Sequence, residues 1–264
     1  MPTAETSDGT GLHYERTGAG APVLLVMGLG MNATGWWRTV PVLAERFEVV
    51  AFDNRGCGRS DRPPGPYSIE LLVEDAVRVL DSAGIERAHV YGVSLGGMIA
   101  MELALRHPER VERLVLAATT AGGANAAIPA PEVLKLVALR AQMTAEQAAW
   151  ASVPINYSPR TRRSFAQRIA EDVEQRLRFP MHPDGYAAQL AAGQGHDCGN
   201  RLGALRAPTL IVQGEDDVLV PPENARRLAE LIPHAELRLW PETAHLLFTD
   251  EPQIDQEVAR WLAA

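Results

Sequence analysis

Short apolar runs alternate along the chain with longer segments in which apolar positions recur every three or four residues. The apolar runs are nearly continuous and rich in β-branched residues, which is typical of parallel strands buried on both faces. An N-terminal β-hairpin that turns at Asp8-Gly9 is expected to precede them. The predicted strands cover residues 21–28, 47–53, 87–93, 111–118, 207–214 and 235–241.

The segments between these runs have the pattern of amphipathic helices. In the segment 68–84, Leu72 and Val79 fall on one apolar face, Ser68 is placed to cap the N-terminus, and Gly84 is placed to end the helix. Regular alternation of strands and helices predicts an α/β fold with a doubly wound, mostly parallel sheet.

Residues 120–200 interrupt this alternation, because they contain helix-like segments and no convincing strand. We therefore expect two parts. Residues 1–119 and 201–264 form the α/β core, and residues 120–200 form a helical cap inserted over one edge of the sheet.

One short motif carries candidate chemistry. Residues 92–96, Gly-Val-Ser-Leu-Gly, match the G-x-S-x-G nucleophile elbow, and they have the strand before and the helix after that this motif requires. The glycines give clearance at a sharp turn that would expose the Ser94 hydroxyl. A purely structural glycine-rich turn is the simpler alternative, and a phosphate-binding loop would need a lysine and a different spacing.

A serine nucleophile needs a base and an acid that orients the base. Of the seven histidines, His245 directly follows the last predicted strand, so it shares a sheet edge with Ser94. His196 is the alternative. The acid is expected just past strand 207–214, where Asp216 and Asp217 stand together.

Two backbone N–H groups are expected to stabilise an oxyanion. One belongs to Leu95, which follows the nucleophile. The other is assigned to Leu29, because the flanking Gly28 and Gly30 let the backbone turn inward. The glycines of this loop do not complete a dinucleotide-binding fingerprint.

Composition and net charge limit the classes of molecule that the protein is expected to bind. The net charge of −8 argues against a nucleic-acid surface. No apolar run approaches the roughly 20 residues of a membrane span, and the polar start of the sequence lacks the apolar core of a signal peptide. The separated Cys57 and Cys198 suit a reducing compartment, so we expect a cytoplasmic protein without metal, cofactor, nucleic-acid or membrane partner. Self-association into a homo-oligomer is left open.

Four segments together resemble the α/β-hydrolase superfamily. The elbow with its following helix and strand (92–116) is joined by FDNRGCGRSDRP (52–63), GEDDVLVPPENA (214–225) and AHLLFTDEP (244–252). The chain looks most similar to 3-oxoadipate enol-lactonases and related carboxylesterases. The resemblance implies the fold and favours Asp217 over Asp216, which gives a triad of Ser94, Asp217 and His245. One departure is Met27, where many relatives carry histidine before the glycine of the oxyanion loop.

The predicted reaction is hydrolysis of a carboxylic ester or lactone of a small to medium, partly apolar molecule through an acyl-enzyme. Gly28, Trp36 of the oxyanion loop and Trp150 of the cap are the candidate substrate contacts. Asp53 and Arg55 are interpreted as residues that pin a loop, and the arginine-rich stretch 160–178 as a solvated, salt-bridged face. The alternatives are thioester or C–C bond hydrolysis or cofactor-free lyase or oxygenase chemistry on the same fold, and a non-catalytic small-molecule receptor.

Overall fold

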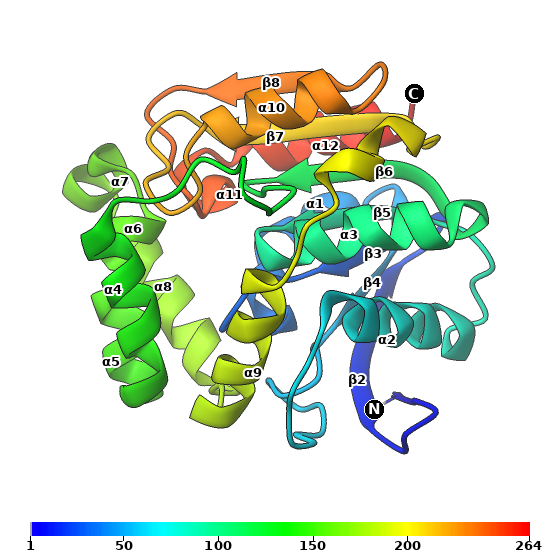
Figure 1. Ribbon diagram of the computed structural model, residues 1–264, viewed down its shortest axis with the longest axis horizontal. Coiled ribbons are helices and arrows are strands. Elements are labelled where there is room, and N and C mark those ends of the chain that lie inside the picture. Colours follow the sequence, from blue (N-terminus) through cyan, green and yellow to red (C-terminus); the bar gives the residue numbers. More distant parts are fainter. Residues whose placement is uncertain (1) are drawn as a thin grey trace.

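A computed structural model describes residues 2–264, and these residues build one eight-stranded sheet (Figure 1). The strand order is β1-β2-β4-β3-β5-β6-β7-β8, in which the pairs β1–β2 and β2–β4 are antiparallel and all other pairs are parallel. The predicted α/β class and mostly parallel sheet are confirmed. The strands are β1 (Thr3–Glu5), β2 (Gly11–Gly18), β3 (Ala21–Val26), β4 (Phe47–Phe52), β5 (Ala88–Val93), β6 (Val111–Ala117), β7 (Thr209–Gly214) and β8 (Glu236–Trp240).

The N-terminal hairpin is also confirmed. Strands β1 and β2 pair with Glu5 opposite Gly11. The turn between them is closed by the Thr10 N–H, which donates to the Asp8 carboxylate at 3.1 Å, and by Gly9, whose φ is +80°. Aspartate and glycine suit these two turn positions because one offers a side-chain acceptor and the other tolerates positive φ.

Helices cover both faces of the sheet. The first face carries α2 (Ile69–Ser82), α3 (Leu95–Arg106) and α10 (Glu223–Leu231). The second face carries α1 (Thr39–Leu43), α11 (Leu247–Asp250) and α12 (Gln253–Leu262). Helix α2 begins as the sequence predicts, because the Ser68 hydroxyl accepts the Leu71 N–H at 3.2 Å.

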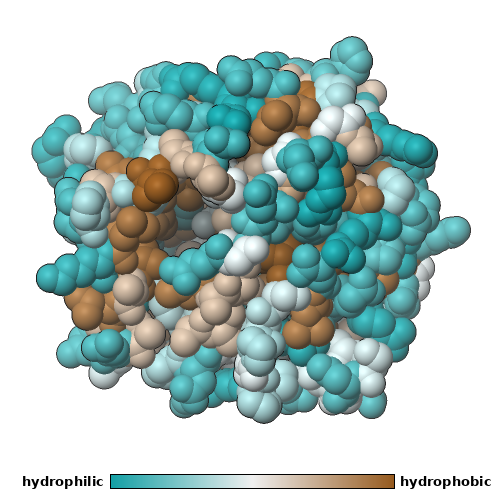
Figure 2. Space-filling view, in the orientation of Figure 1, coloured by the Kyte–Doolittle hydropathy of each residue, from teal (hydrophilic) through white to brown (hydrophobic). Residues whose placement is uncertain are grey.

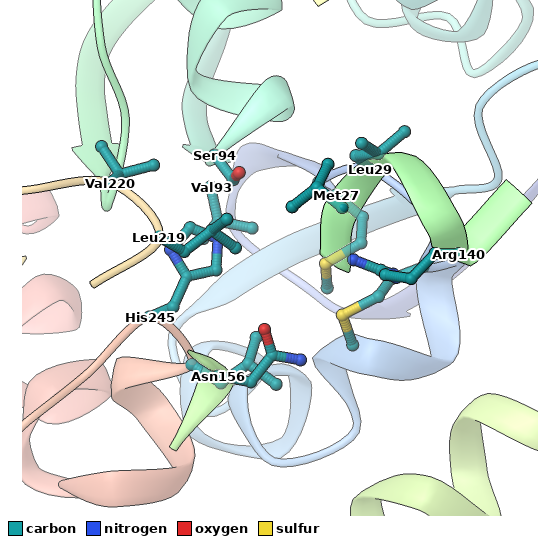
Figure 3. Close-up of a pocket in the computed structure, with 13 residues that line it drawn as sticks. Met27, Leu29, Val93, Ser94, Arg140, Asn156, Leu219, Val220 and His245 are labelled. Atoms are coloured by element: carbon teal, nitrogen blue, oxygen red, sulfur yellow. The ribbon is translucent and has the colours of Figure 1, made fainter. Parts of the chain in front are cut away.

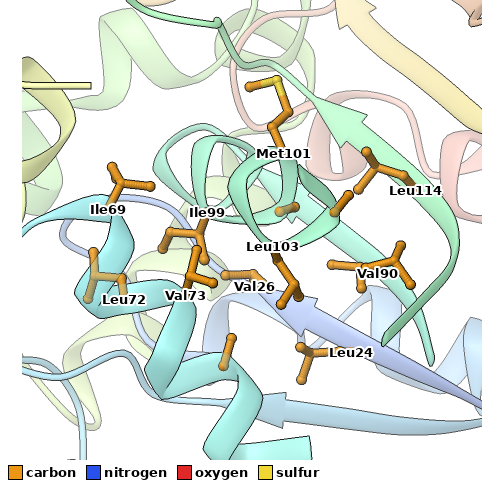
Figure 4. Packing of buried hydrophobic residues seen from close by; sticks show 14 of the residues in the cluster. Leu24, Val26, Ile69, Leu72, Val73, Val90, Ile99, Met101, Leu103 and Leu114 are labelled. Atoms are coloured by element: carbon orange, nitrogen blue, oxygen red, sulfur yellow. The ribbon is translucent and has the colours of Figure 1, made fainter. Parts of the chain in front are cut away.

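The strands supply residues to both sides in alternation. In β3, Leu24 and Val26 pack against α2 and α3 (Figure 4), whereas Val23 and Leu25 join the core on the opposite face. All four side chains are fully buried, and each contributes about 1.5–3 kcal/mol of hydrophobic stabilisation. Burial on both faces explains why the strand sequences are continuously apolar.

Residues between β6 and β7 form a group of helices at one end of the sheet, the end to which the arrowheads of β6 and β8 point (Figure 1). An isolated β-bridge pairs Gly122 with Asp197 at the base of this insertion. That the cap behaves as a separate unit stays a prediction. Its helices are α4 (Pro131–Leu139), α5 (Ala145–Ala151), α6 (Val153–Asn156), α7 (Pro159–Ser164), α8 (Ala166–Leu177) and α9 (Pro183–Gln194).

Helix α8 is fixed to the core by a buried carboxylate. Asp172 accepts hydrogen bonds from Trp37 Nε1 at 2.9 Å and Arg38 Nε at 3.2 Å in the core. It also accepts the Tyr157 hydroxyl at 3.2 Å and the Thr249 hydroxyl at 2.6 Å. The prediction that the acids of this stretch form a solvated face is therefore wrong for Asp172, which binds the cap to the core.

Within residues 2–264, every helix is too short or too polar to cross a bilayer.

Candidate active site

The strand-to-helix turn at Ser94 has strained geometry. Ser94 stands between β5 and α3 with φ of +57°, a value that non-glycine residues rarely adopt. A Cβ on Gly92 would lie 2.2 Å from the Gly96 carbonyl oxygen, so a side chain at residue 92 would not fit across the turn. Strain of this kind persists where the surrounding structure enforces it, often at functional sites.

Gly96 has a different role from the one that the motif suggests. A Cβ on Gly96 would lie 2.0 Å from the Val26 carbonyl oxygen, on the neighbouring strand β3. A Cβ on Gly28 would lie 3.0 Å from the Cβ of Ser94. Gly96 therefore lets the end of β3, and the loop that follows it, approach the elbow closely.

This approach brings the two candidate oxyanion donors close to Ser94. Leu29 lines the same cavity as Ser94, and Leu95 directly follows Ser94 at the start of α3 (Figure 3). Among residues 2–264, neither the Leu29 nor the Leu95 N–H donates to a protein acceptor. Both donors, together with the positive end of the α3 dipole, are free to stabilise a developing negative charge.

Asp217 and His245 meet as a buried pair. The Asp217 Oδ2 atom lies 2.9 Å from His245 Nδ1, and both residues are at least 95% buried. The other carboxylate oxygen of Asp217 accepts the N–H groups of Leu219 and Val220, each at 2.8 Å. A carboxylate held in this way fixes the imidazole so that Nε2 faces the cavity and can accept a proton.

The loop that carries His245 is held from both sides. The Ala244 N–H donates to the buried Asp250 carboxylate at 2.7 Å, and the Leu246 N–H donates to the Asn156 carbonyl at 2.8 Å. Asp250 also accepts the Ser158 N–H at 2.9 Å, so cap residues contribute to positioning the base. The sequence interpretation missed this anchoring, although Asp250 stands inside the quoted histidine segment.

Ser94 and His245 line one cavity, His245 reaching it from the loop after β8 (Figure 3). In the part of the chain that the structure describes, the Ser94 hydroxyl forms no hydrogen bond with His245. Catalytic hydrogen bonds are often loose in a free enzyme and tighten when substrate binds.

The alternative residues lie elsewhere. His196 packs beside the buried carboxylate of Glu102, 3.8 Å away, and does not line the cavity. Asp216 is exposed, and its backbone N–H donates to the Thr243 carbonyl at 2.9 Å.

The segment Asp53-Asn54-Arg55-Gly56 holds neighbouring loops in place. Asp53 is fully buried and accepts the Ala33 N–H at 2.7 Å and the Arg59 N–H at 2.9 Å. Arg55 binds both oxygens of Asp75 at 2.5 Å. Cys57 and Cys198 are both buried and form no disulfide with each other. Burial raises the pKa of the Cys57 thiol, so this thiol stays protonated.

Two predicted substrate contacts need correction. Trp36 is fully buried and packs on Tyr91 and Phe248, with ring centroids 4.9 and 5.3 Å apart. Trp150 is 48% exposed and lies outside the cavity. The sequence indicated large aromatic residues near the site, but helical phase placed one in the core and the other on the surface. Gly28, in contrast, lines the cavity.

Two polar residues of the cavity were not singled out from the sequence. Arg140 at the end of α4 and Asn156 at the end of α6 both project into it (Figure 3). The remaining lining is mostly apolar, and Met27, in place of the histidine of many relatives, is part of it. These lining residues are Met27, Gly28, Leu29, Met31, Val93, Val137, Leu219, Val220 and Leu246.

The arrangement suits acyl transfer. A hydroxyl on a strained turn, an imidazole oriented by a carboxylate and two free N–H groups surround one cavity, as nucleophilic attack on a carbonyl requires. Among residues 2–264, no cluster of three or more His, Cys, Asp or Glu side chains is placed to hold a metal ion.

Known proteins resemble this chain along nearly its whole length. A protein described as "Putative carbamate hydrolase RutD" from Azorhizobium caulinodans is 36% identical over 262 residues, which are 98% of this chain and 96% of the relative. A 2-hydroxymuconate semialdehyde hydrolase from Pseudomonas sp. strain CF600 is 33% identical and is matched over 89% of this chain and 83% of its own length. The solved enol-lactonase from Burkholderia xenovorans LB400 superposes with a TM-score of 0.89 at 27% identity, with both chains fully covered.

A family model agrees with these relatives. The model of the alpha/beta hydrolase fold matches residues 21–252, which include the elbow, the acid loop and the histidine loop. With the sheet order, the elbow and the relatives pointing the same way, the chain belongs to the α/β-hydrolase fold family of hydrolases.

Proposed function

We propose that this protein is a serine hydrolase that cleaves a carboxylic ester or lactone through an acyl-enzyme. The observation that carries the proposal is the oriented Asp217–His245 pair facing the same cavity as Ser94, whose elbow adjoins two free N–H donors. The proposed substrate is a small molecule, because the site is a cavity between the sheet edge and the cap helices.

The mechanism follows from the positions of the atoms. His245 Nε2 removes the proton of the Ser94 hydroxyl while its oxygen attacks the carbonyl carbon. The Leu29 and Leu95 N–H groups stabilise the oxyanion, and one such donor contributes about 2.7–4 kcal/mol to the transition state. His245 then protonates the leaving alkoxide and later removes a proton from the water that releases the acid.

The relatives motivate a second reaction on the same nucleophile. One is named for carbamates and another for a semialdehyde. An ester is favoured here because the oxyanion donors and the base suffice for a carbonyl with an alkoxide leaving group, and no additional residue is needed. A carbamate and a β-diketone therefore belong in the same substrate panel.

Ser94→Ala tests the proposal. We expect it to abolish p-nitrophenyl acetate hydrolysis and labelling by a fluorophosphonate probe, because both need the hydroxyl. Ser7→Ala, which alters an exposed serine, is the control and should keep both. Wild-type rates in Ser94→Ala would refute the assignment, and cleavage of only the carbamate or the β-diketone by the wild-type protein would replace the ester by that substrate.

A further inference from the structure

Arg140 places a buried positive charge at the cavity. The residue is 6% exposed and stands where α4 ends, at the start of the turn η3 (Arg140–Gln142). Its guanidinium projects into the cavity on the side opposite His245 (Figure 3). A Cβ on Gly30 would lie 2.7 Å from one terminal nitrogen of Arg140, so the guanidinium also adjoins the oxyanion loop.

This guanidinium has no protein acceptor. Within residues 2–264, the Arg140 side chain donates no hydrogen bond and no carboxylate lies within 4.0 Å of it, and its buried Nε is unpaired. The guanidinium lies over the Tyr186 ring in a cation–π contact, with the ring centroid 4.9 Å from the guanidinium carbon. An uncompensated buried charge is costly, so such a group is retained where a ligand completes it.

A second arginine strengthens the positive charge. Arg176 of α8 and Arg140 both line a second hollow, together with Gly30 and Tyr186, and Arg140 also lines the cavity that contains Ser94. In the described part of the chain, the Arg176 side chain likewise forms no ion pair or hydrogen bond with a protein group. Burial lowers the pKa of Arg140, and burial followed by the charge of Arg140 lowers the pKa of Arg176 to about 9. A nearby anion would stabilise both cations.

We propose that the substrate carries a carboxylate that Arg140 binds, while an apolar segment of the substrate spans the distance to the carbonyl attacked by Ser94. This inference rests on the proposed function. The guanidinium presents parallel N–H groups that match a carboxylate.

The test compares two esters of equal length. Mono-p-nitrophenyl glutarate carries a free carboxylate, and p-nitrophenyl methyl glutarate has the same chain with that charge removed. We expect wild-type kcat/KM to be at least about 10-fold higher for the anionic ester. Arg140→Gln should lower that value about 100-fold, the scale for loss of a buried charge pair, and change the neutral ester by less than about 3-fold.

Two further variants define the role of the charge. Arg140→Lys should recover part of the preference, because it keeps the charge and loses the planar fork. Arg163→Gln, an exposed arginine of the same cap, should leave both esters unchanged. Equal loss for both esters in Arg140→Gln, or no loss for either, would overturn the proposal.

Inhibition of the wild-type enzyme gives a readout that needs no variant. Glutarate should compete with the neutral ester at a concentration at least about 10-fold lower than glutaramide, which lacks charge. Equal inhibition by the two would refute carboxylate binding. Failure here is distinct from failure of the proposed function, because Ser94-dependent cleavage of the neutral ester would remain.

Discussion

Two buried arginines, Arg55 and Arg140, differ in whether a carboxylate of the protein binds their charge. Arg55 is 2% exposed and binds Asp75 through two hydrogen bonds of 2.5 Å and Asp8 through one of 2.9 Å. Arg140 is almost as buried, yet within residues 2–264 it has no carboxylate partner. The first charge is satisfied inside the protein, whereas the second faces the cavity that Ser94 and His245 line.

The difference separates structural from functional charge. A satisfied buried ion pair fixes loops, and its removal leaves a partner unpaired. An unsatisfied charge in a cavity adds little to the stability of the free protein and is available to a ligand. The same distinction applies to Asp217 and His245, which we expect to affect the reaction rate more than the stability of the fold.

The largest effect is expected on catalysis. Asp217→Asn should lower kcat for p-nitrophenyl acetate by about 10⁴-fold, because the amide favours the wrong imidazole tautomer. Thermal unfolding should change little, since the amide keeps much of the hydrogen bonding. Asp216→Asn, at the exposed neighbouring acid, is the matched control. A kcat within about 10-fold of wild type would contradict the role of Asp217.

The next largest effect is expected on stability. Arg55→Gln should lower the free energy of unfolding by about 3–5 kcal/mol, because it leaves Asp75 buried without its cation. Denaturant unfolding measures this. Arg62→Gln, at an exposed arginine nearby, should stay within about 0.5 kcal/mol. If Arg55→Gln changed the preference between the two glutarate esters and left stability intact, the comparison would be wrong.

A third effect depends on pH. Asp255 is buried with one hydrogen bond, from Thr39 at 2.8 Å, and burial raises its pKa from 3.8 to about 7. Between these values the folded protein keeps a proton that the unfolded chain has released, so rising pH destabilises the fold. Relative to Asp255→Asn, the wild-type free energy of unfolding should fall by about 2 kcal/mol from pH 5 to pH 7 and level off above about pH 8.

Unfolding at pH 5, 6, 7 and 8 measures the difference between wild type and Asp255→Asn. Glu230→Gln, at an exposed carboxylate of α10, should show a difference from wild type that does not vary with pH. A constant difference for Asp255→Asn as well would show that Asp255 is ionised throughout this range.

The smallest effect is expected on the stability of an Arg140 variant. Arg140→Gln should leave the free energy of unfolding within about 1 kcal/mol of wild type or raise it, because the wild-type charge has no partner to lose. Denaturant unfolding without ligand measures it. A loss as large as that of Arg55→Gln would make Arg140 a structural residue.

Much of the fold followed from local pattern. The strands were readable because both of their faces are buried, and Gly92 and Ser94 were readable because a sharp strand-to-helix turn restricts residue type. The pairing of Asp217 with His245 followed from sheet topology and family resemblance, since both residues come after strands that end at one edge.

The contacts of the cap were not readable in this way. Trp36 and Trp150 were chosen by size and place, but which face a side chain takes depends on packing between segments remote in sequence. Arg140 looked like one of many arginines, because a missing partner becomes visible only when all neighbours are placed. Asp172 was expected on a solvated face, but it is buried, because its hydrogen-bond partners Trp37 and Arg38 belong to the core.

The anchoring of the His245 loop has a consequence for how molecules enter. Asn156 binds the backbone of Leu246, and Ser158 binds the Asp250 side chain. The end of the cap near α6 therefore cannot swing outward without displacing His245, the base of the proposed mechanism. Figure 2 shows a hollow bordered by apolar side chains. We expect substrate and product to pass on the α4 side, where Ile128 and Leu134 are exposed. A variant that carries the cap of another hydrolase should retain turnover only if residues 156–158 are preserved.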